Sequence, residues 1–195
     1  IVQGDRLEDY FEDVPGQWGQ IFGGIYLTQT SKDNVIRNAI IKNGTVGITI
    51  DSNINENPTL LLENTQILNM SFIGIRGQDS RIVANNTVVA NCGDHAVALQ
   101  YGGDYEFNHC TFANYWSGNP RSKATLLLNN HFKDRDGATR VRDFNATFTN
   151  TIVHGSLDEE VEIDNEDGED FLYYFGHCAL KRDTNELEDP EQFQD

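Results

Sequence analysis

The chain has 195 residues, enough for one domain with a core of its own. Its 14 basic and 31 acidic residues give a formal net charge of −17, which argues against nucleic acid and anionic lipid as partners, because both bind through a basic surface. No apolar run approaches the roughly 20 residues that a membrane-spanning helix needs, so we expect no membrane span.

A short phrase recurs along the chain, and each copy starts with a polar residue, here called the origin residue. The clearest copies are NTVVAN at 86–91 and HCTFAN at 109–114, which are 23 residues apart. Most spacings fall between 22 and 27 residues, and one of 41 leaves room for a degenerate copy near Asn130. Such spacing is typical of stacked repeats, because each repeat is too small to bury its own apolar face. The origin residues are Asn38, Asn64, Asn86, His109, Asn150 and His177.

Apolar and small residues recur at every second position on either side of each origin residue. Val, Ile, Thr and Phe are frequent there, and period two with such residues indicates short strands separated by a bend. We therefore predict an all-β fold, a parallel β-helix solenoid of about seven to eight coils of roughly 22 residues each. The position two residues before the origin should form one buried column that includes Ile36, Leu62, Phe107 and Phe148.

Asparagine recurs at the origin and again five residues later. Equivalent positions in neighbouring coils of a β-helix lie about 4.8 Å apart, so an Asn amide can bond to the Asn above and below it. Asn also tolerates the left-handed conformation that sharp bends require. We interpret both sets, with the His residues that replace Asn, as structural ladders rather than catalytic groups. The second set is Asn43, Asn69, Asn91 and Asn114.

A further strand is predicted about ten residues after several origins, at 47–51, 73–77 and 96–100. If Ile48, Ile75 and Val97 point into the solenoid, the alternate residues point outward. The expected outward positions are Thr49, Arg76 and Ala98, followed one step further along by Asp51, Gln78 and Gln100.

We predict a single domain, 1–195. Three of its segments contain no copy of the repeated phrase. Residues 1–15 read as an entry segment, 157–170 as an acidic insertion and 183–195 as a polar tail. The chain starts without Met and shows no signal peptide, which we interpret as a processed product or a piece of a longer protein.

The insertion packs nine acids into fourteen residues. Its spacing does not fit an EF-hand loop, so we favour a solvated loop with a weakly ordered tip, in which 161–163 forms a short strand. No cofactor is firmly predicted. Calcium is the one cation that the acids suggest, bound loosely, with Asp164, Asp167 and Asp170 as its candidate ligands.

Three cysteines are an odd number, so at least one thiol is free. Cys110 and Cys178 share an inward column but lie about three coils apart, roughly 14 Å at the strand spacing. A disulfide needs Cα atoms within about 7 Å. We therefore expect Cys92, Cys110 and Cys178 all to be reduced.

The repeated phrase and the Asn columns resemble the right-handed parallel β-helix proteins of the pectate-lyase-like superfamily. PGQWG at 15–19, the strand that ends at Asp51 and GGDYEFNHCTFANYW at 102–116 are similar to a group of β-helix surface proteins from Bacteroidetes. The resemblance covers about 4–195 and implies an exported, often lipid-anchored protein without an assigned activity. It implies an extracellular or cell-surface location and, as partner, a glycan or an outer-membrane protein complex.

One hypothesis for function is a polysaccharide-active enzyme, a lyase, epimerase or glycoside hydrolase. Such enzymes need a base and a cation beside the sugar, or two carboxylates about 5 to 9.5 Å apart. The outward strand faces and their rims offer candidates, although no set reproduces the calcium carboxylates and catalytic Arg of pectate lyases. The catalytic candidates are Asp51, Arg76, Asp79, His95 and Asp104.

The other hypothesis, which we favour, is a non-catalytic solenoid that binds glycan or a partner protein along its wall. Tyr and Trp suit this role because their rings stack on apolar sugar faces while their polar atoms form hydrogen bonds. Trp18 and Tyr105 are more typical of core filling. The candidate binding residues are Gln78, Gln100, Tyr101, Tyr115 and Trp116.

Overall fold

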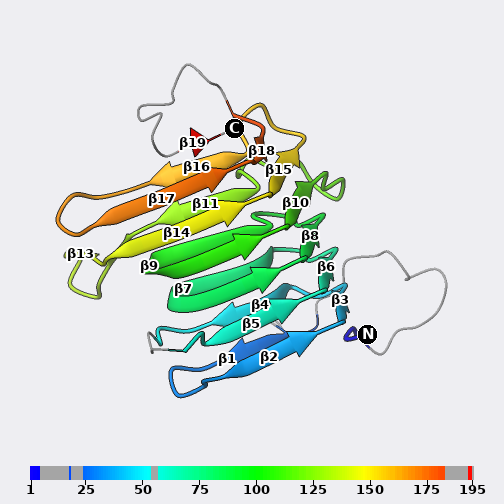
Figure 1. Ribbon diagram of the computed structural model, residues 1–195, viewed down its shortest axis with the longest axis horizontal. Helices are drawn as coiled ribbons and strands as arrows, with labels where there is room; N and C mark the ends of the chain where they lie inside the picture. Colours follow the sequence, from blue (N-terminus) through cyan, green and yellow to red (C-terminus); the bar gives the residue numbers. More distant parts are fainter. Residues whose placement is uncertain (5–17, 19–23, 54–56, 183–192, 195) are drawn as a thin grey trace.

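The structure is a computed structural model that describes residues 1–4, 18, 24–53, 57–182 and 193–194. Within these ranges every regular element is a β-strand, and no helix there is long and apolar enough to cross a membrane. Almost all pairing is parallel, and strands that are neighbours in space come from successive repeats of the sequence (Figure 1). The predicted parallel β-helix is therefore confirmed.

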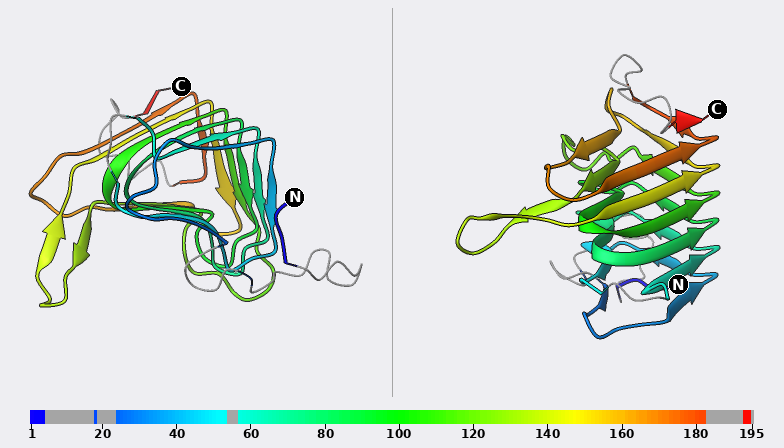
Figure 2. Two further views of the ribbon diagram at one scale, coloured as in Figure 1. Left: turned by 90° about the horizontal axis from the view of Figure 1, so that it is seen from below. Right: turned by 60° about the vertical axis from the view of Figure 1, so that its left-hand side comes forward.

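The strands stack in three columns, and seen along the solenoid axis they overlie one another coil by coil (Figure 2). Column one contains β1 (Ile25–Leu27), β4 (Val46–Ile50), the first halves of β7 (Ile73–Asn85) and β9 (Val97–Asn108), β11 (Leu126–Asn129) and β16 (Val161–Asp164). Column two contains β2 (Asn34–Arg37), β5 (Leu60–Glu63), the second halves of β7 and β9, β14 (Phe144–Thr149), β17 (Phe171–Gly176) and β19 (Phe193–Gln194). Column three contains β3 (Ile40–Lys42), β6 (Gln66–Leu68), β8 (Val88–Ala90), β10 (Thr111–Asn114), β15 (Ile152–Gly155) and β18 (Ala179–Leu180).

The described residues complete six coils, numbered here from the N-terminus. This is fewer than the seven to eight expected, because two coils are long. Coil five contains an antiparallel hairpin of β12 (His131–Lys133) and β13 (Thr139–Val141), which projects away from the solenoid (Figure 2). Coil six contains the acidic insertion, whose residues 161–164 form β16 and join column one.

Aromatic stacking fills the bore at the position two residues before the origin. Phe107 and Phe148 are fully buried, with ring centroids 5.4 Å apart and planes 5° from parallel. Phe175 continues the stack at 4.7 Å from Phe148. Leu62 is buried below them, and Ile36 packs against the same core. The predicted buried column is confirmed.

The bends between columns two and three are made by single left-handed residues. Each origin residue is exposed and has a φ between 48° and 54°, the conformation that Asn adopts most readily after Gly. Asn86 donates a hydrogen bond to Asn64 (2.8 Å), the only side-chain bond between two origin residues in the described part of the chain. Backbone conformation, more than a continuous amide ladder, therefore accounts for these asparagines.

The second Asn set behaves less uniformly. Asn43, Asn69 and Asn91 have φ values of 62°, 56° and 56°. Asn114 differs, because it lies buried in β10 and bonds to the backbone of the preceding coil, accepting from the Cys92 amide (2.9 Å) and donating to the Asp94 carbonyl (2.8 Å). Asn114 is therefore not a member of an amide ladder and instead ties coil four to coil three.

The outer side of column one is not the open wall that the alternation predicted. The register places Thr49, Arg76 and Ala98 side by side as expected. Thr49 and Ala98 are nevertheless fully buried, and Ala98 joins Val46, Ile73 and Leu127 in a small apolar cluster separate from the main core. Small and aliphatic residues at these positions favour burial, so this face offers no extended polar surface for a ligand.

The three cysteines are free, as expected. Burial raises the pKa of the Cys92 thiol to about 12 and that of Cys110 to about 11. These thiols are therefore protonated near neutral pH and pack as small apolar groups.

Candidate functional site

The connection between columns one and two differs greatly in length from coil to coil. Coils three and four turn this corner within a continuous strand: one residue, Asp79, separates the paired positions in β7, and two, Tyr101 and Gly102, separate them in β9. The neighbouring coils use longer connections, including the β12–β13 hairpin (Figure 1). The two tight corners therefore lie between longer segments on both sides along the axis.

The tight corners hold residues in uncommon backbone conformations. Asp79 has a φ of 44° and Tyr101 one of 68°, followed by Gly102 at 94° and Gly103 at 116°. A left-handed Tyr costs roughly 1–2 kcal/mol, and such strain persists only where the surroundings impose it. Here the Tyr101 amide donates to the side chain of Asn129 (3.2 Å). A Cβ atom on Gly102 would lie 2.4 Å from Cβ of Arg142, so the hairpin base packs directly on this corner.

Two glutamine amides lie side by side at the corner. The register pairs Gln78 with Gln100 in adjacent coils, about 4.8 Å apart along the axis. Both are partly buried, and within the described part of the chain neither side chain has a hydrogen-bond partner. They therefore present free amide donors and carbonyl acceptors to solvent.

The carboxylates beside these amides are already engaged. Asp51 accepts a hydrogen bond from the phenol of Tyr26 (2.9 Å), which raises the pKa of Tyr26. Asp79 accepts from the Ser52 hydroxyl (2.7 Å) and lies 3.9 Å from Nε of Arg142 on the hairpin. With its pKa raised, Tyr26 remains a protonated donor near neutral pH, which does not suit it to act as a general base.

Two tyrosines lie near the amide pair: Tyr26 bonds to Asp51, and Tyr101 directly follows Gln100 in the chain. Tyr26 of coil one is 43% exposed. Tyr101 of coil four packs against Phe132 of the hairpin, with ring centroids 5.0 Å apart. The corner site, defined as Gln78, Asp79, Gln100 and Tyr101, thus combines apolar ring surface with unpaired polar groups.

Of the other predicted catalytic residues, His95 and Asp104 lie elsewhere, whereas Arg76 is close enough to act on the Tyr26 phenol, the hydrogen-bond partner of Asp51. Arg76 lies in the middle of column one and is partly buried. His95 is 4% exposed, and its Nδ1 lies 2.7 Å from the Ala124 carbonyl oxygen. Burial lowers the pKa of His95, so it is neutral near pH 7. Asp104 lies on the outer side of column two, 3.2 Å from Nε of Arg81.

Tyr115 and Trp116, predicted as binding residues, lie after β10, on the column-three side of the molecule. Tyr115 is 54% exposed and bonds to His154. Trp116 packs against Gly118, where a Cβ atom would lie 2.7 Å from its ring. Trp116 is therefore a packing residue of its loop, and neither residue belongs to the corner site.

The candidate calcium ligands do not form a cluster. Asp164 accepts a hydrogen bond from the Asn129 amide (2.9 Å), and Asp167 and Asp170 are exposed. No three Asp, Glu, His or Cys side chains within the described ranges are arranged to hold a metal ion. The tip is also better anchored than predicted, because the Asn130 side chain exchanges two hydrogen bonds of 2.9 Å with the backbone of Glu166.

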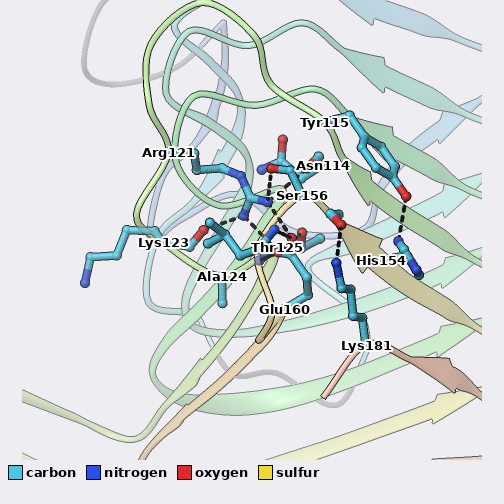
Figure 3. A network of polar contacts seen from close by, with 12 residues as sticks. Asn114, Tyr115, Arg121, Lys123, Ala124, Thr125, His154, Ser156, Glu160 and Lys181 are labelled. Carbon is cyan, nitrogen blue, oxygen red and sulfur yellow. Dashed lines mark hydrogen bonds and ion pairs between the residues drawn. The ribbon is translucent and has the colours of Figure 1, made fainter. Parts of the chain in front are cut away.

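Sequence reasoning missed one polar network altogether (Figure 3). Arg121 and Glu160, the latter in the insertion expected to be solvated, form a buried ion pair of 2.5 Å, and their side chains are 1% and 0% exposed. Glu160 also accepts from the Thr125 amide (2.9 Å) and hydroxyl (2.6 Å) and from the Leu157 amide (2.7 Å). Burial alone would raise the pKa of Glu160, but these donors outweigh it and lower the pKa.

The network has no sequence signature, because Arg121 and Glu160 are 39 residues apart and nothing local marks either as buried. Tyr26, Ser52, Phe132 and Arg142, which border the corner site, were missed for a related reason. They reach the corner from coil one, coil two and the coil-five hairpin, and only the register brings them together.

Comparison with known proteins supports the architecture. A family model for the right-handed β-helix region matches residues 18–112, which include coils one to three and most of coil four. No curated protein and no solved structure matches the chain significantly. The matched region and the stacked parallel coils together show that the chain is a right-handed parallel β-helix protein.

Proposed function

We propose that this β-helix is a non-catalytic glycan-binding protein and that its ligand lies across the corner site. The observation that carries the proposal is the pair of amides, Gln78 and Gln100, held one coil apart next to Tyr101 and without a hydrogen-bond partner in the described part of the chain. Side-chain amides bond sugar hydroxyls as donor and acceptor at once, and tyrosine rings stack on the apolar faces of pyranoses.

Rigidity of the site supports this role. The continuous strands β7 and β9 carry the amides, and the hairpin base packed on Gly102 fixes the backbone of Tyr101. A site on rigid elements loses little conformational entropy when a ligand binds. This favours recognition of a glycan without a large rearrangement.

The engaged carboxylates favour binding over catalysis. A glycosidase needs one carboxyl group as acid and another as base or nucleophile, both aimed at the same bond. Asp51 and Asp79 instead accept hydrogen bonds from Tyr26 and Ser52. The same two carboxylates disfavour an anionic sugar, so we propose a neutral glycan.

A glycan ligand also fits an extracellular or cell-surface location, which we include in the proposal. The resemblance of the Trp18 region and of 102–116 to exported β-helix proteins is the observation that supports it. Detection of the native protein in the medium or on intact cells by surface proteolysis would test this location.

The test begins with a panel of immobilised neutral and acidic glycans, followed by calorimetric titration with the best soluble oligosaccharide. The double variant Gln78→Ala/Gln100→Ala should weaken binding about 30-fold, the loss expected for two hydrogen bonds of about 1 kcal/mol each. Asn145→Ala removes an exposed amide on the outer side of column two and serves as the matched control.

Two results would contradict the proposal. The first is the absence of binding to any neutral glycan, or binding that the double variant leaves unchanged. The second is release of new reducing ends or unsaturated products from a polysaccharide, lost in Asp79→Asn, which would establish the enzyme hypothesis instead.

A further inference from the structure

The outer side of column three carries two aligned rows of mostly apolar or small residues. The strand register aligns two outward rows across all six coils. None of the twelve residues is acidic, and seven are aliphatic or alanine. The first row is Ile40, Gln66, Val88, Thr111, Ile152 and Ala179, and the second is Lys42, Leu68, Ala90, Ala113, His154 and Lys181. These residues define the column-three face.

An exposed aromatic pair is fixed at the upper end of this face (Figure 3). The Tyr115 and His154 rings are 5.9 Å apart with planes 24° from parallel, and the Tyr115 hydroxyl lies 2.6 Å from Nδ1 of His154. Ile152, on the strand of His154, is 45% exposed. Lys181 of the next coil donates to the Gly155 carbonyl (3.1 Å).

The buried network holds this pair in position. Arg121 donates to the Asn114 carbonyl (2.9 Å), immediately before Tyr115, while Glu160 fixes Arg121. A large exposed ring with two torsions, pinned by a hydrogen bond and a fixed backbone, has little rotamer entropy left to lose on binding. Packing in the core does not account for a tyrosine at 115 or an isoleucine at 152, because both side chains are exposed.

The dimensions of the face limit what can cover it. Six strands at about 4.8 Å give a length of roughly 24 Å, and two outward rows about 7 Å apart give a strip roughly 10 Å wide. A stable protein interface buries about 800 Å² per partner, several times this strip. An extended polymer running along the solenoid axis fits the strip better.

We propose that the column-three face is a second glycan-binding surface, which takes an extended neutral polysaccharide with one sugar stacked on Tyr115 and His154 and Lys181 bonding its hydroxyls. This inference rests on the proposed function at the corner site. The corner lies at the opposite end of column two from column three (Figure 1). One molecule therefore binds two separate glycan segments and cross-links polysaccharide chains.

The experiment uses the oligosaccharide selected in the glycan panel and the long polymer from which it derives. Calorimetry of the wild-type chain should give about two oligosaccharides per protein, and mixing with the polymer should produce turbidity. Tyr115→Ala should reduce the stoichiometry to about one, abolish the turbidity and weaken retention on the immobilised polymer about 100-fold. Tyr115→Phe, which keeps the ring, should retain both sites. Leu172→Ala, at a 56% exposed apolar residue of column two, is the control for nonspecific adsorption.

The outcomes separate the two proposals. A stoichiometry of one that Tyr115→Ala leaves unchanged overturns the second surface and keeps the corner site. A stoichiometry unaffected by Gln78→Ala/Gln100→Ala but reduced by Tyr115→Ala overturns the corner site and keeps this face. Concentration-dependent dimerisation that Tyr115→Ala abolishes, measured by light scattering without glycan, would show that a second copy covers the face and would overturn the inference.

Discussion

Removing the carboxylate of Glu160 should be among the most damaging single substitutions on the surface loops. Glu160→Ala would leave the Arg121 guanidinium buried without its counter-ion and leave the Thr125 and Leu157 amides without an acceptor. Breaking a buried pair from one side typically costs 3–5 kcal/mol, and the orphaned amides act in the same direction. We expect a loss of about 4 kcal/mol, a large share of the stability of a domain, typically about 5–15 kcal/mol.

Urea denaturation followed by circular dichroism measures this loss as a shift of the midpoint. Glu63→Ala is the matched control, because it removes the carboxylate of an exposed ion pair with Arg37 and should cost less than about 1 kcal/mol. The apolar double variant Arg121→Met/Glu160→Leu should be more stable than Glu160→Ala, since no charge is left buried alone. A loss below about 1 kcal/mol for Glu160→Ala would refute the assignment of Arg121 and Glu160 as a buried pair.

The same pair predicts a pH dependence with a definite sign. The folded-state pKa of Glu160 is lowered from its usual 4.5, so the folded protein binds this proton less readily than the unfolded chain. Its contribution to stability is therefore fully present above about pH 5.5 and is lost as the pH falls through 4.5 toward the lowered folded value. The difference in midpoint between wild type and Glu160→Gln should narrow as the pH is lowered from 7 to 3. A constant difference over this range would contradict the ionised state of Glu160.

Three further outcomes are expected. Phe107→Ala should cost about 3 to 5 kcal/mol in the same denaturation assay, because Phe107 stacks on Phe148 in a core that cannot close around the gap; a loss near that of a surface substitution would contradict the stacked column. Alkylation of the denatured protein without reductant should modify all three thiols, as counted by mass spectrometry, whereas a count of one would reveal a disulfide. Calorimetric titration with Ca²⁺ should show binding in the millimolar range at best; micromolar binding abolished by Asp164→Asn or Asp167→Asn would show a preformed site.

The features that sequence predicted well are those set by neighbouring residues. The bends follow from Asn and His at the origin, since a residue's own side chain determines how readily it adopts the left-handed conformation, and φ is about 50° at all six positions. The inward column follows from period-two alternation, so Phe107 and Phe148 could be assigned to one stack without any long-range information.

The features that sequence did not predict depend on contacts between coils. Asn114 occupies the same place in the phrase as Asn91, yet it turns inward because Cys92 and Asp94 of the preceding coil offer it backbone partners. Glu160 stands in a run of acids that reads as solvated, and only the return of the chain beside Arg121 makes its burial favourable. The corner site was not predicted for the same reason. Alternation places Gln78 and Gln100 outward, but it does not show that their amides lack a hydrogen-bond partner in the described part of the chain.

The net charge is the clearest case in which composition misleads about a surface. Of the 31 acids, 20 lie in 1–17, 158–170 and 183–195, while 18–157 and 171–182 together contain 13 basic and 11 acidic residues. Charges more than about 8 Å from a site are largely screened at physiological salt. Asp51, Asp79, Arg76, Arg142 and, through Asn129, Asp164 are charged groups beside the corner site, so the proposed ligand preference depends on them more than on the total of −17. The twelve residues of the column-three face include no acid, so under the proposal this face would select by shape and ring stacking instead, and the two surfaces would accept the same neutral polymer for different physical reasons.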